Sequence, residues 1–406
     1  MNKISVLNQL PVEYNRVRLE KILTDIQFQL NGISEGGITA SYNALTAAPT
    51  TGTYTVSDFI RNSNAANGIF GWECIADGTP GTWQTITTTE STSRSDNPII
   101  NGEPLVDQAN NGAIVTLTAN GANSPQYSAD MWTLNNGGTA PGLPTAQQFT
   151  NTTGTLPLPA GAKAYVRITR GAVQDAAPNI NANYQFRYAV EGFNWARYSD
   201  GTSLALTRTL VFQVRSSLTG TFSGSFRNAG AARSYPFNYT ILALGTWTII
   251  AIQLVGDTTG TWATDNTVGC YLTFDLGSGA TARGTAGNWV AGNYVGVTGS
   301  ASLIAAANAT DYLDFTLVDI LEGSQSRPYP HLTIGDVLTQ CKRYKRKQAF
   351  YIPVTASPAS QIIDMRIVPV ITGGGVGYSS TGTTADTIVH SQTTGATATL
   401  TLEASL

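Results

Sequence analysis

The sequence has few charged side chains. Only 12% of its 406 residues are Asp, Glu, Lys or Arg, about half of the usual share. It holds six lysines and nine glutamates, so residues that favour helices are scarce. The net charge of −3 provides no overall basic field, and we therefore expect no nucleic-acid partner.

The residues of common catalytic and metal sites are also scarce. The three cysteines, Cys74, Cys270 and Cys341, are odd in number and far apart, which is typical of buried thiols made in a reducing cytoplasm. The two histidines, His331 and His390, lie in separate regions. Cys-x-x-Cys and phosphate-loop motifs are missing, so we assign no catalytic residue, metal site or cofactor.

Long apolar runs are missing too. No segment approaches the roughly 20 apolar residues that span a bilayer, and residues 1–10 lack the apolar centre of a signal peptide. We expect no membrane insertion. A protein of this kind that acts outside the cell would leave by another route, such as lysis.

Glycan cleavage is the enzymatic alternative, and it needs two carboxylates that flank the scissile bond. The candidates are Asp311, Asp314 and Asp319, or Glu191 with Asp200. The odd spacing of Asp311 and Asp314 places them on opposite faces of a strand, where they cannot converge. We therefore expect a protein that is not an enzyme.

Glycine (41 residues) and threonine are abundant, and aromatic residues make up 9% of the chain. This composition is typical of short strands joined by tight turns. Apolar and polar residues alternate at 222–226 and 271–276, as in half-buried antiparallel strands. About eight such strands between residues 111 and 325 predict a jelly-roll-like β-sandwich.

Residues 11–33 predict a helix near the start of the chain. Its apolar residues recur at alternating spacings of four and three, with Arg16 also on the seam, as in a heptad repeat. Leu at a with Ile at d favours trimers or tetramers, although an amphipathic helix docked on a β domain fits the same pattern. The predicted oligomerisation seam comprises Val12, Leu19, Leu23, Ile26, Leu30 and Ile33.

The remaining segments predict two smaller units. Residues 54–110 form a small β module and a polar linker, and residues 326–406 form a helix, at Thr333–Ala349, followed by strands. One basic run stands out, for which a solvated helix face, nucleic-acid binding and pairing with acidic loops of another subunit are alternatives. It consists of Lys342, Arg343, Lys345, Arg346 and Lys347.

Three motifs, in this order, carry a resemblance to a known family. Gly71-Trp-Glu-Cys74 with Gly78-Thr-Pro-Gly-Thr-Trp83 resembles a module of phage tail-fibre and appendage proteins. Ser225–Asn228, Arg233–Phe237, Thr246-Trp247 and Gly256–Trp262 resemble the jelly-roll region of phage virion proteins. Cys341-Lys-Arg-Tyr344 is similar to the Cys-Gln-Arg-Tyr helix that follows that sandwich. Lys342 replaces the family's Gln and Lys345 its usual second aromatic residue. The matches extend from residue 54 to residue 350.

The resemblance implies a virion component made in the host cytoplasm, usually a homotrimer, with β domains that face the host. Residues 1–50 would then trimerise or dock on other virion proteins, and the sandwich would attach the particle to host surface glycan. A head or neck protein that reinforces the particle is the alternative, followed by a glycan-cleaving fibre. Exposed aromatic rings stack on sugars, although this composition favours the alternative that each ring packs on the core or on a neighbouring chain. The candidates are Trp195, Tyr198, Trp262, Trp289 and Tyr294.

Overall fold

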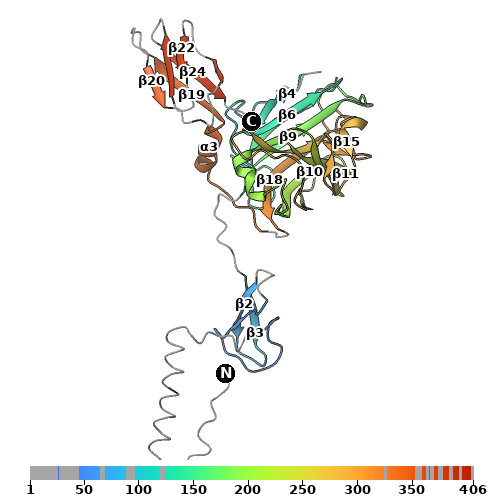
Figure 1. Cartoon of the computed structure of the whole chain (residues 1–406), viewed down its shortest axis with the longest axis vertical. Coiled ribbons are helices and arrows are strands. Elements are labelled where there is room, and N and C mark those ends of the chain that lie inside the picture. The colour runs from blue at the N-terminus through green and yellow to red at the C-terminus, as the bar shows by residue number, and fades with distance from the viewer. Residues whose placement is uncertain are drawn as a thin grey trace, which may run out of the picture. The chain divides into compact units, whose positions relative to one another are not determined.

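The structure is a computed structural model. It describes Ile26 and residues 45–64, 69–87, 97–118, 125–323, 327–352, 359–362, 365, 370–373, 378–383, 387–392 and 396–403, and beyond residue 345 only Met365 and Leu402 among the side chains. The chain divides into two compact units, Met1–Ser93 and Arg94–Leu406. Both are built mainly from antiparallel strands (Figure 1). This confirms the predicted mainly β fold.

The first unit holds a three-stranded sheet. Its strands are β1 (Phe59–Arg61), β2 (Ile69–Ala76) and β3 (Thr82–Thr87), paired antiparallel in that order. Trp72 and Cys74 point into its small core. Most of the predicted N-terminal helix and its seam lie outside the described residues. Ile26 alone is described there; it is helical and 42% exposed.

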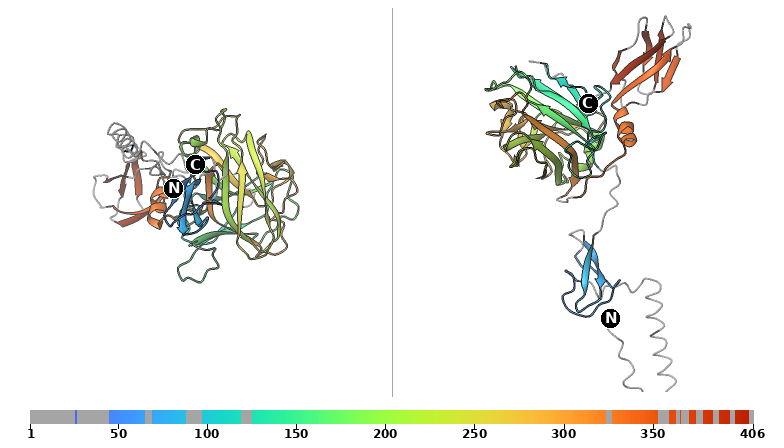
Figure 2. Two further views of the ribbon diagram at one scale, coloured as in Figure 1. Left: turned by 90° about the horizontal axis from the view of Figure 1, so that it is seen from below. Right: turned by 180° about the vertical axis from the view of Figure 1, so that it is seen from behind.

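The second unit contains a β-sandwich with two layers (Figure 2). One sheet has the order β13-β10-β18-β8-β7-β4, with β4 at Val115–Thr116, β7 at Thr145–Thr150, β8 at Ala164–Thr169, β10 at Arg208–Ser216, β13 at Thr248–Leu254 and β18 at Tyr312–Glu322. The other has the order β16-β12-β11-β14-β9-β6-β5, with β5 at Gln126–Ala129, β6 at Trp132–Gly137, β9 at Asn183–Glu191, β11 at Gly220–Asn228, β12 at Arg233–Ile241, β14 at Val268–Asp275 and β16 at Val290–Ala291. Strands close in sequence recur in opposite sheets, as in a jelly roll.

Aromatic rings fill the space between the two sheets. Phe274 of β14 lies 4.4 Å from Phe315 of β18 and 5.0 Å from Phe212 of β10, measured between ring centroids. All three rings are buried, and each contributes about 1.5–3 kcal/mol by burial. Because side chains alternate along a strand, the residues directly before and after each of these phenylalanines point away from the core.

Residues 97–107 belong to the sandwich and not to a linker. Ile99, Leu105 and Val106 lie in its core. Asn101 Nδ2 donates to the carbonyl oxygens of Val106 and Asp130, both at 2.9 Å. The prediction of a linker up to residue 110 was therefore wrong at this end, because the polar residues that suggested it are buried and hydrogen-bonded within the fold.

The predicted helix at Thr333–Ala349 is shorter in the structure. Helix α3 (Ile334–Lys342) begins with a capping box, in which the Thr333 hydroxyl accepts from the backbone N–H of Asp336 at 3.2 Å. Strand β19 (Lys345–Ile352) follows almost at once and pairs with β24 (Ala396–Glu403). This pairing, with a segment about 50 residues later, ends the helix.

The remaining elements are short. The sandwich also carries short helices and one parallel strand pair. These are α2 (Gly192–Trp195), η3 (Ala196–Tyr198), η4 (Ala280–Ala282) and the pair of β15 (Arg283–Gly284) with β17 (Gly296–Val297). Strand β24 also pairs with β21 (Val370–Gly373), and a separate sheet has the order β20 (Ala359–Ile362), β23 (Thr387–Gln392) and β22 (Tyr378–Thr383). Among the described residues, no helix is both long and apolar enough to cross a membrane.

Candidate functional site

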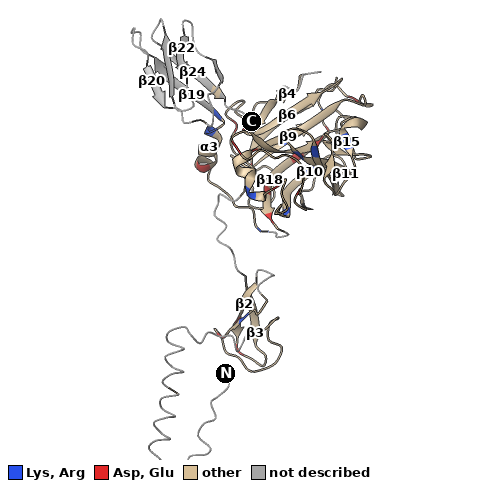
Figure 3. Cartoon of the chain, viewed as in Figure 1, with Lys and Arg blue, Asp and Glu red and all other residues tan. Residues whose placement is uncertain are grey.

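The outer side of the seven-stranded sheet carries a continuous group of polar side chains, which we call the polar face. They alternate along neighbouring strands with the core residues, so strand register brings them together: Thr133 pairs with Arg187, Arg187 with Thr273, and Tyr271 with Arg227. Most positions of the sandwich are uncharged (Figure 3). The polar face comprises Tyr127, Thr133, Asn135, Gln185, Arg187, Ser225, Arg227, Tyr271 and Thr273.

Arg227 is the most deeply buried charge of the polar face. Only 5% of it is exposed. Its Nη1 donates to Asn293 Oδ1 at 2.6 Å, and its Nη2 donates to Gln185 Oε1 at 2.7 Å and to Thr273 Oγ1 at 3.2 Å. All of these partners are neutral, so they orient the guanidinium without compensating its charge.

Arg187 is partly exposed and lies against an aromatic ring. Its Cζ is 4.5 Å from the centre of the Tyr271 ring, while Arg227 Cζ is 5.7 Å from the same ring. In the orientation that satisfies both of its amide atoms, Asn135 accepts from Arg187 Nη2 at 3.1 Å. Tyr271 is also partly exposed, so this end of the polar face presents a guanidinium and an aromatic ring side by side.

Two buried polar atoms here have no hydrogen-bond partner among the described residues. They are Arg227 Nε and Ser225 Oγ. Burial of polar groups without partners is costly. Burial, reinforced by the nearby charge of Arg187, lowers the pKa of Arg227 to about 10, and burial also lowers the pKa of Arg187. Both guanidiniums still carry their charge at neutral pH.

One end of the polar face is covered and the other is open. Residues 276–300 lie over the covered end, where Val297 donates its backbone N–H to Ser223 Oγ at 3.0 Å. At the open end a shallow hollow is lined by Pro125, Tyr127, Met131, Thr133, Arg187, Ala189 and Tyr344. A ligand can therefore approach from the side of Arg187 and Tyr271.

The aromatic residues predicted to stack on sugars lie elsewhere, and most are buried. Trp195 and Tyr198 are each 1% exposed, and Trp262 is 9% exposed. Trp289 is partly buried against the core and donates to the carbonyl of Val255 at 2.8 Å. The prediction that the three buried rings stack on sugars was wrong, because they pack inward around a buried arginine. Tyr294 is half-buried, and its backbone N–H is held by Ser234 Oγ at 3.0 Å.

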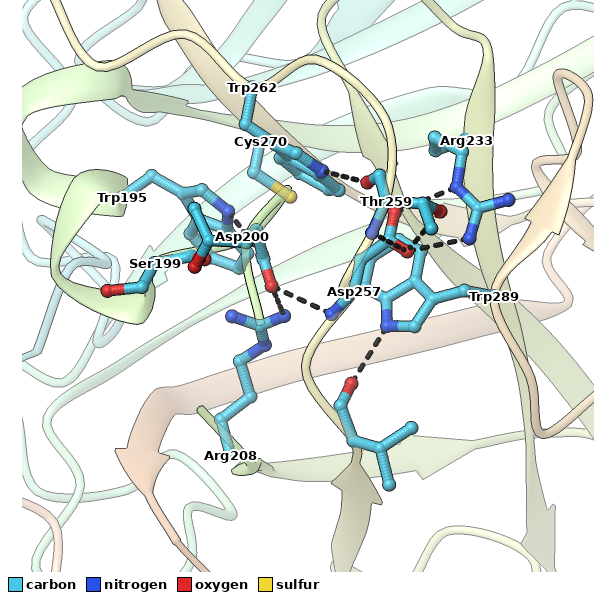
Figure 4. A network of polar contacts seen from close by, with 12 residues as sticks. Trp195, Ser199, Asp200, Arg208, Arg233, Asp257, Thr259, Trp262, Cys270 and Trp289 are labelled. Atoms are coloured by element: carbon cyan, nitrogen blue, oxygen red, sulfur yellow. Dashed lines mark hydrogen bonds and ion pairs between the residues drawn. The ribbon is translucent and has the colours of Figure 1, made fainter. Parts of the chain in front are cut away.

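These buried rings enclose an ion pair (Figure 4). Arg208 Nη2 lies 2.7 Å from Asp200 Oδ1, and both side chains are fully buried. Trp195 Nε1 donates to Asp200 Oδ2 at 2.9 Å, and Arg208 Cζ lies 4.7 Å from the Trp195 ring. Burial raises the pKa of Asp200 even beside Arg208. The network joins loops at one end of the sandwich, which is a structural role.

The basic run is divided between two elements. Lys342 ends α3, Arg343 follows it, and Lys345 begins β19. Arg343 Nη2 lies 2.9 Å from Glu191 Oε1 within the same chain. Lys345 is buried, with Nζ 3.9 Å from the centre of the Tyr127 ring. Arg346 and Lys347 lie in β19, and their side chains are outside the described part of the chain.

The carboxylates considered for catalysis have partners in the fold. Asp314 is buried between Arg167 and Arg215, with shortest N–O distances of 2.7 and 2.5 Å. Glu191 pairs with Arg343 and accepts from Tyr344 Oη at 2.7 Å. Within the described residues, no three His, Cys, Asp or Glu side chains are grouped so that they could hold a metal ion. The three cysteines are buried and unpaired, as predicted.

Sequence reasoning missed Arg187 and Arg227. A signal was present, since Arg187 lies between Phe186 and Tyr188 and Arg227 follows Phe226, in a chain poor in charge. The two side chains meet because β14 alone separates their strands. This follows from the order of the strands in the sheet. The sequence alone does not contain that order.

Comparison with protein-family models and with curated proteins found no match. Solved structures show a distant likeness. The enzymatically active domain of tailspike protein 4 of Bacteriophage CBA120 is 12% identical, with a TM-score of 0.26, over 57% of this chain and 22% of that chain. A family 11 carbohydrate-binding module from Clostridium thermocellum, in complex with a β-1,3-1,4-mixed-linked tetrasaccharide, is 11% identical, with a TM-score of 0.23, over 53% of this chain and 98% of that one. A structure described as "CBM4 structure and function" is 13% identical, with a TM-score of 0.26, over 55% and 98%.

Proposed function

We propose that this chain is a non-enzymatic component of a bacteriophage virion, a trimeric tail fibre or appendage that attaches the particle to glycan on the host surface. The observation that carries the attachment is the open end of the polar face, where Arg187 and Tyr271 lie side by side with cation–π geometry. An aromatic ring offers a flat surface to a sugar, and a guanidinium donates several hydrogen bonds to its oxygens.

The sequence supports the other parts of the proposal. The three phage-like motifs occur in order between residues 54 and 350, and the heptad seam of residues 12–33 favours trimers or tetramers. A trimer would present three polar faces to one surface. Several weak sites on one particle add up to firm attachment, since each later binding event is intramolecular.

The test combines location with binding. Antibody directed to the C-terminal region should label intact particles, and the purified protein should bind host envelope polysaccharide and compete with particles for adsorption. Labelled particles without any polysaccharide binding would instead identify a decoration protein of the head or neck. Release of reducing ends from the polysaccharide would identify a glycan-cleaving fibre.

A further inference from the structure

The arginines of the sandwich fall into two groups by partner. Several have a carboxylate within ion-pair distance: Arg167, Arg208, Arg215, Arg233 and Arg283. In contrast, no described carboxylate forms an ion pair with Arg187 or Arg227. The described part of the polar face therefore holds two guanidinium charges that nothing of opposite sign balances.

We infer that the polar face binds an acidic glycan, and that Arg187, backed by Arg227, holds an oxyanion of that glycan, a carboxylate or a phosphate. This inference rests on the proposed attachment function and names its ligand class. Buried charges in proteins are normally paired, because an unpaired one has lost its hydration without compensation. Neighbouring like charges add repulsion, so an arriving anion gains from both.

The geometry assigns the two arginines different tasks. Arg187 is partly exposed beside the hollow, so it contacts the ligand. A planar guanidinium matches the two oxygens of a carboxylate or phosphate. Arg227 is held by Asn293, Gln185 and Thr273 behind the Tyr271 ring, so it is a positioning residue that adds positive potential.

Neighbouring groups do not cancel that potential. Glu191, the carboxylate at the end of β9, is already bound by Arg343 and Tyr344. Asp275, which pairs with Gln185 in the sheet, is bound by Arg283 at 2.7 Å. Lys345, at the Tyr127 end of the hollow, interacts electrostatically with the buried carboxylate of Asp130, so we do not count it toward the unbalanced charge.

The test compares acidic and neutral forms of one glycan. Host envelope polysaccharide is used before and after activation of its carboxyl groups with a carbodiimide and their reduction with borohydride, and before and after removal of its phosphate. We expect one of the two treatments to weaken binding of the full-length protein by about 10- to 100-fold, as loss of a charge-assisted contact does. If loss of the carboxyl groups weakens binding, the oxyanion is a carboxylate, and if loss of the phosphate does so, it is a phosphate.

Variants of single arginines test whether Arg187 binds the oxyanion. Arg187→Gln should reduce affinity for the untreated glycan to that for the treated glycan, and Arg187→Lys should retain part of it. Arg197→Gln removes an exposed arginine of η3 and should leave the affinity for the glycan unchanged. Thermal unfolding and particle size verify that each variant is folded and has its normal assembly.

Each result decides something. Equal binding of treated and untreated glycan, or unchanged binding by Arg187→Gln, overturns the acidic ligand while leaving glycan attachment intact. Absence of binding to every form of the glycan removes the attachment function, and the inference with it.

Discussion

Arg187 and Arg227 project from β9 and β11 onto the same face of the sandwich, and the Tyr271 ring of β14 lies near both, 4.5 Å and 5.7 Å from their Cζ atoms. On the other sheet two arginines also meet, but there Asp314 bridges them. One arrangement is complete within the chain. The two arginines of the polar face have no such bridging carboxylate among the described residues.

Removal of the Tyr271 ring should weaken glycan binding. We expect Tyr271→Ala to lower affinity for host polysaccharide by about tenfold, or 1.4 kcal/mol, because it removes both a stacking surface and the support of Arg187. Tyr271→Phe keeps the ring and should retain most of the affinity. Titration calorimetry measures both, and equal loss in the two variants would show that the hydroxyl matters and the ring does not.

Asp314→Asn should destabilise the sandwich strongly. The change leaves Arg215, a buried guanidinium, without its counter-ion, and loss of one partner of a buried pair costs about 3–5 kcal/mol. Urea unfolding measures the loss. Asp265→Asn is the matched control, because the Asp265 side chain is exposed and its carboxylate, among the described residues, accepts hydrogen bonds from Thr267 in its own turn.

Tyr239→Phe should stabilise the protein, by about 1 kcal/mol. The Tyr239 hydroxyl is buried and has no hydrogen-bond partner among the described residues, so its removal relieves a desolvation cost. Tyr235→Phe is a weaker comparison, since that hydroxyl donates to the carbonyl of Gln253 at 3.4 Å. A loss of stability in Tyr239→Phe would contradict the interpretation.

Alkaline pH should unfold the protein through its buried tyrosines. Burial raises the pKa of Tyr188, Tyr239 and Tyr329 above the ordinary 10. Their stabilising contribution is therefore complete below pH 10 and is lost as the unfolded chain ionises above it. We expect urea midpoints to fall from about pH 10 upward, and more gently in Tyr239→Phe. Ultraviolet titration should show these tyrosinates only on unfolding.

The junction of α3 with the sandwich should depend on Tyr344 more than on Arg343. Both contact the buried Glu191, but the Tyr344 ring is buried whereas the Arg343 side chain is 46% exposed. Tyr344→Phe should cost about 1–3 kcal/mol, because a buried carboxylate loses a donor, and Arg343→Gln less than about 1 kcal/mol. Hydrogen exchange of the α3 amides measures both. The reverse order would show that the ion pair holds the helix.

Deletion of residues 1–33 tests the predicted seam. If these residues trimerise the chain, the shortened protein should elute as a monomer and lose avidity for polysaccharide on a surface, while single-site affinity in solution stays unchanged. A shortened protein that remains trimeric but is missing from particles would identify the segment as a docking element.

The sequence by itself determined the class of the fold. Few helix-forming residues, many turn residues and the alternation in Phe222–Phe226 and Tyr271–Leu276 predict short antiparallel strands. Most of the polar side of these two strands is also buried, which the tertiary structure decided. Composition and alternation are local properties, and they hold wherever the strands are placed. The cap of α3 at Thr333 is local too, but its end at Lys342 depends on the distant strand β24.

Tertiary structure alone decided which residues form the candidate site. The sequence singled out Trp195 as a ligand candidate and passed over Arg187, yet the indole packs inward on Arg208 and the guanidinium is partly exposed. Arg187 and Arg227 lie 40 positions apart and meet only because β14 pairs with both of their strands in one register. Charge compensation depends on such long-range pairing, so neither the balanced Asp314 cluster nor the unbalanced polar face can be read from the chain alone.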